Sequence, residues 1–126
     1  MNKKSDNYAT DITIMDMFDN WFDPCKLNNG VLRDFDGLGS DWKDKTFVNP
    51  PYSKPIDWVK KAIEENKKGK RIVMLLRMDT STRWFKMLQE SGAVFLWLNG
   101  RLRFNTGKPA PFPSMLAILP RQEQLT

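Results

Sequence analysis

The chain has 126 residues, 40% of them hydrophobic and 28% charged, which is typical of one globular domain with a single core. Its 20 basic and 15 acidic residues give a net charge of +5, which is compatible with a polyanionic partner. The absence of histidine excludes histidine-based catalysis and His-ligated metal sites. The single cysteine excludes an internal disulfide and a cysteine-rich zinc site, and it fits a reducing compartment such as the cytoplasm.

The first 45 residues carry few regular patterns. Residues 1–9 resemble a flexible tail without the apolar stretch of a secretion signal, and no apolar run anywhere approaches the roughly 20 residues of a membrane span. Ile12, Met15 and Phe18 recur at helical spacing, which predicts a short amphipathic helix over 11–20. Residues 21–24 predict a short strand that ends in a turn. Residues 25–45 are poor in apolar side chains and predict mostly loop.

The rest of the chain alternates between strand and helix patterns. In chain order, the sequence predicts a strand at 46–48, a helix at 54–68, a buried strand at 72–76, a helix at 82–90, a second buried strand at 94–98, an edge strand at 101–104, a loop at 105–113 and a last strand at 115–119. Pro55 and Gly69 bound the first of these helices, and Asp79, Thr80 or Ser81 can cap the second. This alternation predicts an α/β fold with a mostly parallel sheet flanked by helices. Trp42, Trp58, Trp84 and Trp97 are expected in the core.

The loop Asn49-Pro50-Pro51-Tyr52 directly follows the strand at 46–48 and is the most informative feature of the sequence. Two consecutive prolines fix two φ angles and remove two backbone donors, so the loop is rigid. Open α/β sheets bind ligands where strands end. The Asn49 amide oxygen and the Pro50 carbonyl can each accept one hydrogen of an exocyclic amine, and Tyr52 can stack on the ring that carries it. The loop therefore suits a flat base with an amino group.

The tetrapeptide resembles the catalytic motif of S-adenosylmethionine-dependent amino-methyltransferases, above all the DNA adenine enzymes. From about Tyr8 to Pro120 the chain is similar to the small phage- and archaeal-virus-type DNA adenine methyltransferases, a Dam-like family. The blocks that carry the similarity are Phe22-Asp23-Pro24-Cys25, Asp36-Gly37-Leu38, Asp41-Trp42, Phe47 to Ser53, Thr82-Arg83-Trp84-Phe85, Gly100 to Phe104 and Ala110 to Ser114. The resemblance implies a single minimal domain, 1–126, with a reduced Rossmann-like methyltransferase fold.

The resemblance also implies roles for individual residues. Asn49, Pro50 and Tyr52 would hold an adenine flipped out of double-stranded DNA, and Pro51 would shape the loop. The residues implied for binding the methyl donor, S-adenosylmethionine, are Thr10, Asp23, Pro24 and either Asp36 or Asp41, although each aspartate taken alone is also typical of a turn. Arg101 and Arg103 alternate as on one face of a strand and, with Lys108, are candidates for phosphate contact. No metal is expected.

Two departures from the family pattern affect these expectations. Asp11 stands where the family has proline, and Arg77 to Thr82 differ from the usual Pro-Ala-Arg-Thr-Asp-Thr, with Asp79 in place of arginine. The segment between Asp23 and Asp36 is too short for a full helix and strand, which leaves weak cofactor binding or a homodimer as alternatives. Three functions therefore remain open: methylation of DNA adenine, methylation of RNA or of a protein glutamine, and a catalytically weak DNA- or cofactor-binding module.

Overall fold

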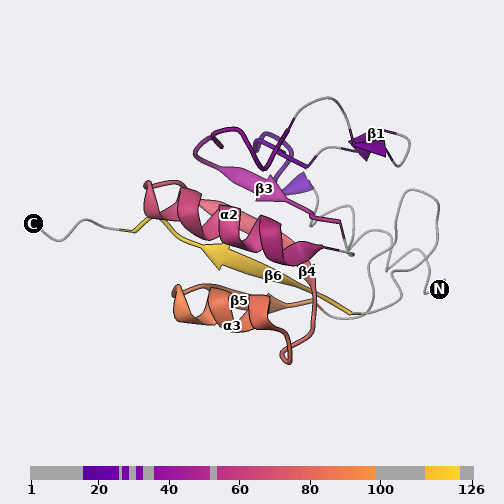
Figure 1. Ribbon diagram of the computed structural model, residues 1–126, viewed down its shortest axis with the longest axis vertical. Helices are drawn as coiled ribbons and strands as arrows, with labels where there is room; N and C mark the ends of the chain where they lie inside the picture. The colour runs from indigo at the N-terminus through magenta and orange to yellow at the C-terminus, as the bar shows by residue number, and fades with distance from the viewer. Residues whose placement is uncertain are drawn as a thin grey trace, which may run out of the picture.

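The computed structural model describes residues 16–25, 36–51, 54–98 and 113–122, together with the backbone at 27–28 and 31–32. A four-stranded sheet forms its centre, in the order β3-β4-β6-β5 (Figure 1). These strands are β3 (Thr46–Val48), β4 (Ile72–Arg77), β5 (Val94–Trp97) and β6 (Ser114–Leu119). All four are rich in the apolar and β-branched residues that fit a pleated, packed surface. The predicted strand at 101–104 and tail at 1–9 lie outside the described residues.

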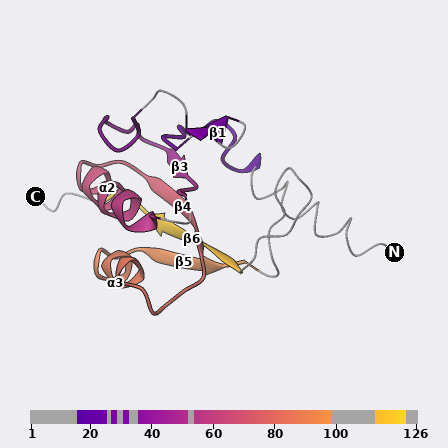
Figure 2. The same cartoon turned by 45° about the vertical axis from the view of Figure 1, so that its right-hand side comes forward.

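The prediction of a mostly parallel sheet is wrong for the described strands. β3 and β4 are parallel, but β6 is antiparallel to both β4 and β5. β4 and β5 therefore run in the same direction, as expected for strands joined through a helix, and β6 fills the position between them (Figure 2). A buried apolar run has the same sequence pattern in either direction, so the pattern could not reveal that β6 is reversed.

Both described helices lie within one residue of their predicted bounds. Helix α2 (Pro55–Lys67) has proline at its start, and Gly69 follows it with a φ of 100°, a value that favours glycine. Helix α3 (Arg83–Glu90) is capped by Thr82, whose hydroxyl accepts a hydrogen bond from the Phe85 amide at 3.2 Å. The predicted caps at Asp79, Thr80 or Ser81 are therefore wrong, by one residue at the nearest.

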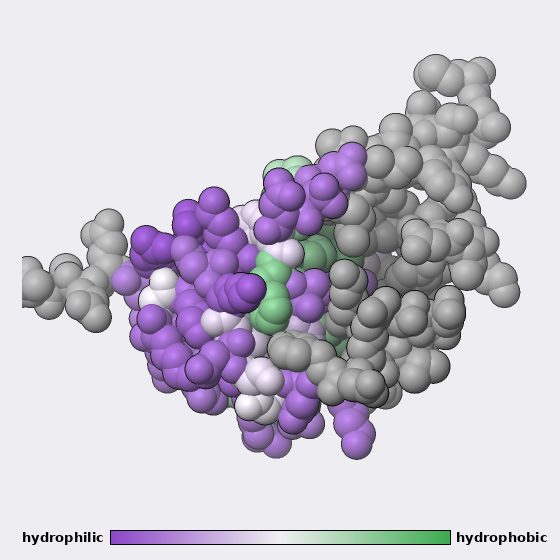
Figure 3. Space-filling model, turned by 90° about the horizontal axis from the view of Figure 1, so that it is seen from above, coloured by the Kyte–Doolittle hydropathy of each residue, from purple (hydrophilic) through white to green (hydrophobic). Residues whose placement is uncertain are grey.

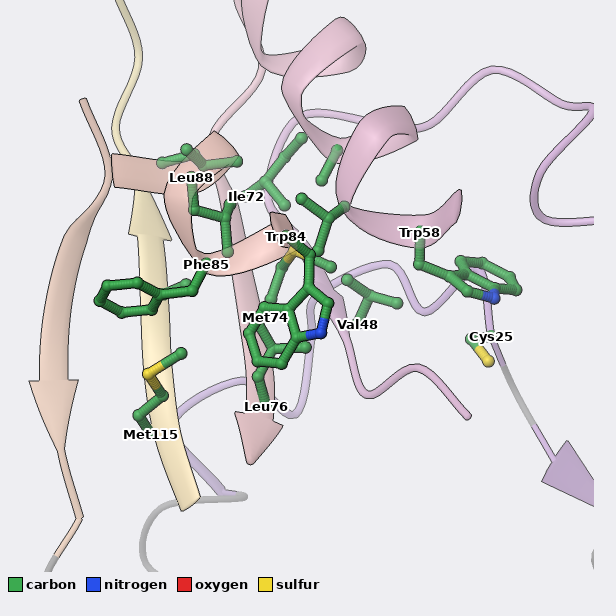
Figure 4. Packing of buried hydrophobic residues seen from close by; sticks show 14 of the residues in the cluster. Cys25, Val48, Trp58, Ile72, Met74, Leu76, Trp84, Phe85, Leu88 and Met115 are labelled. Carbon is green, nitrogen blue, oxygen red and sulfur yellow. The ribbon is translucent and has the colours of Figure 1, made fainter. Parts of the chain in front are cut away.

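The core lies mainly between the sheet and the two helices. Buried side chains from α2, α3 and the sheet form one cluster, which includes Val48, Trp58, Met74, Trp84 and Leu88 (Figure 4). A smaller cluster on the opposite face contains Phe47, Val73, Leu75 and Leu116, and Phe18 and Trp21 pack against it. The first cluster fixes α2 on the sheet, and with it the loop that α2 follows.

Strand β5 is less buried than the sequence predicts. Its only hydrogen-bonded neighbour in the described sheet is β6, so it is an edge strand, and Val94, Leu96 and Trp97 are at least half exposed. The prediction of core tryptophans is confirmed for Trp42, Trp58 and Trp84 and is wrong for Trp97, which is 50% exposed. The apolar content of a strand does not report its position in a sheet, because edge and centre strands can share one composition.

The segment before β3 adds a short parallel contact to the sheet. Phe22 bridges Thr46: its amide donates to the Lys45 carbonyl, and its carbonyl accepts from the Phe47 amide, both at 2.9 Å. The short strand predicted at 21–24 is thus reduced to a single bridge at Phe22, and the predicted turn follows at 24–25. Residues 17–20 form turns, so the predicted helix 11–20 is wrong there, and its earlier part lies outside the described residues.

The region predicted as loop contains a small antiparallel ribbon, β1 (Leu27–Asn28) and β2 (Val31–Leu32).

The described surface seen from above is mostly hydrophilic, with a narrow apolar strip (Figure 3). No helix in the described ranges is long and apolar enough to cross a membrane.

Candidate active site

Asn49, Pro50 and Pro51 leave the carboxyl end of β3 and lead towards α2. Val48, the last residue of β3, is fully buried, Pro50 is buried, and Asn49 and Pro51 are partly exposed. The Lys54 amide donates to the Pro51 carbonyl at 3.4 Å, just before α2 begins at Pro55. The loop is thus held between a buried strand and a packed helix. Tyr52, the fourth residue of the motif, lies outside the described residues.

The two acceptors that the sequence singles out are unused in the described part of the chain. No described donor forms a hydrogen bond with the Asn49 amide oxygen or with the Pro50 carbonyl, whereas the next carbonyl, that of Pro51, accepts from Lys54. Partly buried carbonyl groups normally find donors. These two acceptors therefore have no described donor, as expected of groups that bind a ligand with two N–H hydrogens.

A small hollow lies next to this loop, where the parallel strands β3 and β4 end. It is lined by Pro50, Pro51, Pro55, Leu75, Leu76, Arg77 and Trp84. Figure 4 shows Leu76 near the carboxyl end of β4, with Trp84 from α3 beside it. The walls of the hollow are mostly apolar, and Arg77 is the one charged residue among the residues that line it. An apolar hollow with few polar groups at the carboxyl ends of parallel strands is a typical position for a ligand site.

The structure brings two of the predicted cofactor segments together. The chain at Phe22 pairs in parallel with β3. Asp23 and Pro24, which follow Phe22, therefore lie towards the same end of the sheet as Asn49, which follows β3. Gly37 lies directly against Pro24: a Cβ atom at Gly37 would be 2.0 Å from the Pro24 carbonyl oxygen and 2.8 Å from the Trp58 side chain. Asp23-Pro24 and Asp36-Gly37 are therefore neighbours, and Trp58 of α2 lies behind them.

Both aspartates in these segments form turns. Asp23 accepts a hydrogen bond from the Cys25 amide at 3.0 Å, and Asp36 accepts from the amides of Leu38 and Gly39, both at 3.1 Å. Both residues are exposed. Each carboxylate thus shapes its own loop, and the two loops are in contact through Pro24 and Gly37.

Asp41 lies apart from this group. Its carboxylate is 85% exposed and is 3.5 Å from the ammonium group of Lys68, just past the last turn of α2. The Asn49–Pro51 loop lies at the opposite end of the same helix. The remaining predicted contacts, Thr10 for the cofactor and Arg101, Arg103 and Lys108 for nucleic acid, lie outside the described residues.

Cys25 is buried beside Asp23. Burial, and to a smaller extent the negative charge of Asp23, raise the pKa of the Cys25 thiol to about 11. The thiol is therefore neutral at physiological pH, which is the wrong state for a nucleophile or a metal ligand. Its environment supports the interpretation of Cys25 as a small packing residue.

Sequence reasoning missed two contributors to this end of the molecule. Arg77 and Trp84 line the hollow beside Pro50 and Pro51. Arg77 could have been found by the rule that identified Asn49, since it ends the neighbouring buried strand. Trp84 could not, because only the packing of α3 brings it to the hollow.

Among the described residues, no group of three or more Cys, Asp and Glu side chains could hold a metal ion.

Comparison with known proteins connects this geometry to a family. Residues 3–114 match the family model described as DNA N-6-adenine-methyltransferase (Dam). The chain belongs to this family. The matched range includes the Asn49–Tyr52 loop, the Asp23-Pro24 and Asp36-Gly37 segments, and Arg101, Arg103 and Lys108. The family resemblance inferred from the sequence is therefore confirmed.

Two phage proteins, each named DNA N-6-adenine-methyltransferase, are among the relatives of the chain. The protein of Haemophilus phage HP1 is 34% identical over 82 residues, which cover 63% of this chain and 47% of the relative. That of Escherichia phage T1 is 43% identical over 56 residues, which cover 44% of this chain and 24% of the relative. The chain thus matches less than half the length of either relative. No solved structure matches it.

Proposed function

We propose that this chain transfers a methyl group from S-adenosylmethionine to the exocyclic N6 amine of adenine in double-stranded DNA. The observation that carries the proposal is the rigid loop at the carboxyl end of β3. There, Asn49 and Pro50 hold two acceptors that no described residue uses, in a member of the Dam family. The fold that we propose is a reduced Rossmann-like methyltransferase fold. The parallel Phe22-β3-β4 arrangement, with its ligand end at the carboxyl termini, supports it.

The proposed methyl-donor site is formed by Asp23, Pro24 and Asp36, with Thr10 as a further contact. Asp36 is preferred over Asp41 because Gly37 contacts Pro24, whereas Asp41 pairs with Lys68 near the far end of α2. The pair of exposed carboxylates suits the hydroxyl and ammonium groups of such a donor. When bound, S-adenosylmethionine supplies a methyl group activated by a positively charged sulfur.

Asn49 and Pro50 address the main chemical difficulty of the reaction. The lone pair of an adenine amine is delocalised into the ring, so the amine is a poor nucleophile. By accepting its two hydrogens, these residues favour a geometry in which the lone pair is available, and they stabilise the positive charge that develops on nitrogen. The new N–C bond forms as the C–S bond breaks with its electron pair on sulfur, and the nitrogen then releases one proton. Pro51 keeps the loop rigid.

The target base must leave the duplex before these contacts can form, at a cost of a few kcal/mol. We propose that Tyr52 stacks on the flipped adenine, which returns about 1–3 kcal/mol. Arg101, Arg103 and Lys108 are proposed phosphate contacts. The two relatives are phage proteins, so the host cytoplasm is the proposed compartment. We also propose a homodimer, because the segment between Asp23 and Asp36 is too short for a full helix and strand, and a second copy could complete the cofactor site. Size-exclusion chromatography with light scattering measures the molar mass and tests this.

The decisive experiment measures radiolabelled methyl transfer to unmethylated duplex DNA, RNA and protein side by side, with identification of the product. Wild type is compared with Asn49→Ala and with Asn20→Ala, a control on an exposed turn. We expect label in N6-methyladenine, a loss of about a hundredfold in rate for Asn49→Ala, and wild-type rates for the control. Label only in RNA or in a protein glutamine would assign another acceptor. Cofactor binding without transfer to any acceptor would indicate a binding module.

A further inference from the structure

Arg77 occupies a fixed position beside the catalytic loop. It is the last residue of β4, in register with Ser114 of β6, and the next amide, that of Met78, donates to the Pro113 carbonyl at 2.8 Å. The backbone at Arg77 is therefore held by the sheet. Arg77 lines the hollow together with Pro50 and Pro51. A guanidinium group on a central strand is positioned more precisely than one on a loop.

The Arg77 side chain is incompletely satisfied within the described part of the chain. One terminal nitrogen, Nη2, lies 3.5 Å from Asp79 Oδ2, a distance that fits an ion pair without a short hydrogen bond. The Nε atom is buried and has no described hydrogen-bond partner. A buried donor without an acceptor is costly, and a guanidinium group binds phosphate or carboxylate with two parallel hydrogen bonds. Arg77 thus brings to the hollow a cation with one unused donor and a counter-ion at 3.5 Å.

Two anionic groups take part in the proposed reaction: the DNA backbone and the carboxylate of the methyl donor. The donor segments, Asp23-Pro24 and Asp36-Gly37, lie on the Phe22 side of β3. Arg77 lies on the other side of β3, on β4. The catalytic loop separates the two sides, so the β4 side is the one left for the nucleic acid. This placement favours a phosphate of DNA as the anion at Arg77.

We propose that Arg77 binds a backbone phosphate next to the target adenine and exchanges its contact with Asp79 for that phosphate when DNA binds. This inference rests on the proposed function and adds to it a specific DNA contact inside the site. In the free protein, Asp79 neutralises Arg77, and Asp79 is itself held in place by hydrogen bonds to the amide and hydroxyl of Ser81. Asp79 is thus the counter-ion of Arg77 in the free protein, and a DNA phosphate takes its place in the complex.

The test compares Arg77→Gln with Arg121→Gln. Arg121 also pairs with an aspartate, Asp44, but at the opposite end of the sheet. DNA affinity is measured by fluorescence anisotropy at several salt concentrations, alongside calorimetric titration with S-adenosylmethionine. For Arg77→Gln we expect DNA binding about tenfold weaker and a salt-dependence slope smaller by about one. Affinity for S-adenosylmethionine should be unchanged, and Arg121→Gln should bind both ligands like wild type.

Asp79→Asn provides a second test that leaves Arg77 in place and removes its counter-ion. We expect this variant to bind DNA about 2–5-fold more tightly, and this readout keeps the proposal testable if Arg77→Gln does not fold. An unchanged DNA affinity and salt slope in folded Arg77→Gln would overturn the role of Arg77, as would a selective loss of S-adenosylmethionine binding. If wild type transfers no methyl to DNA, the proposed function fails instead, so the two failures are distinguishable.

Discussion

At the scale of single residues, Gly37 is the point where the two proposed cofactor segments meet. Its carbonyl accepts a hydrogen bond from the Trp42 indole at 2.7 Å, and the space where a side chain would begin is filled by the Pro24 carbonyl and by Trp58. The close approach of the two loops therefore requires the absence of a Cβ atom. This contact holds the loop of Asp36 against the loop of Asp23.

Gly37→Ala should accordingly separate the two loops. The added methyl group would lie 2.0 Å from a backbone oxygen, which cannot rotate away. We expect a loss of about 1–3 kcal/mol in the free energy of unfolding and a weaker affinity for S-adenosylmethionine, measured by chemical denaturation and calorimetry.

Gly39→Ala is the matched control for this prediction, measured for stability. The atoms nearest to its added Cβ would be those of the Asp36 carboxylate, the closest at 2.4 Å, and that exposed side chain can move. We expect Gly39→Ala to cost less than about 1 kcal/mol. Equal stability of the two variants would show that the Pro24–Gly37 contact does not set the loop geometry.

At the scale of elements, α2 connects the proposed catalytic loop to the loop that carries Asp36. The buried Glu65 carboxylate near the end of α2 accepts hydrogen bonds from the Trp42 amide at 2.5 Å and from Lys70 at 2.6 Å, and its other oxygen is 2.7 Å from Lys68. The Trp42 ring also stacks on Trp58 of α2. One helix thus begins at the catalytic loop and holds residues 36–42 from its far half.

Glu65→Ala should loosen this connection. It would leave the buried Trp42 amide without an acceptor, and we expect a loss of about 2–4 kcal/mol in the free energy of unfolding. The neighbouring Glu64 is exposed and lies 3.9 Å from Lys68, so Glu64→Ala should change stability by less than about 0.5 kcal/mol. Urea denaturation of both variants measures the difference. Similar losses would contradict a special role for the buried carboxylate.

The ionisation of Glu65 predicts a specific pH dependence. Burial alone would raise its pKa, but hydrogen bonds from Lys68, Lys70 and the Trp42 amide outweigh that effect and lower the pKa to about 2, from 4.5 in the unfolded chain. A depressed pKa stabilises the fold above the unfolded value, so this contribution should be complete above about pH 4.5 and should be lost as the pH falls towards 2.

Denaturation of wild type and Glu65→Gln as a function of pH measures this contribution. The difference in stability between the two should narrow across that range and stay constant above it. Glu64→Gln, which alters an exposed carboxylate, should follow the wild-type profile. A difference between wild type and Glu65→Gln that does not vary below pH 4.5 would contradict the lowered pKa.

The elements also show what the sequence can and cannot predict. Both helices and the strands at 46–48 and 72–76 were predicted within about one residue, because prolines, glycines and apolar periodicity are local signals. The Asn49–Pro51 loop was predicted for the same reason. The reversal of β6, the exposure of β5 and the contacts of Gly37 and Arg77 depend on which strands and loops become neighbours. No local pattern contains that information.

At the scale of the whole molecule, the two ends of the sheet serve different purposes. The carboxyl ends of β3 and β4 carry the proposed site. At the opposite end, Asp44 pairs with Arg71, which precedes β4, at 2.8 Å, and with Arg121, which follows β6. In Figure 1 the arrow of β6 points to this end, where the C-terminus lies. The Asp44 carboxylate therefore joins the starts of β3 and β4 to the end of β6, at the end of the sheet opposite the proposed site.

Asp44→Asn should reduce stability without changing function. Hydrogen bonds from Arg71, and a smaller effect of the charge on Arg121, hold the pKa of Asp44 well below its usual range, so the carboxylate stabilises the fold above its unfolded pKa and loses this effect in acid. We expect a lower thermal midpoint for Asp44→Asn, a smaller effect in high salt because the pairs are exposed, and unchanged affinity for DNA and for S-adenosylmethionine.

Asp41→Asn is the matched control, since Asp41 pairs only with Lys68 among the described residues and is more exposed than Asp44. We expect it to melt close to wild type. Weaker binding of S-adenosylmethionine by Asp41→Asn would instead place the methyl donor near the far end of α2, against the position inferred from Gly37. Weaker binding of either ligand by folded Asp44→Asn would show that the two ends of the sheet are coupled. The pair of variants thus tests whether the stabilising end and the proposed catalytic end are separate.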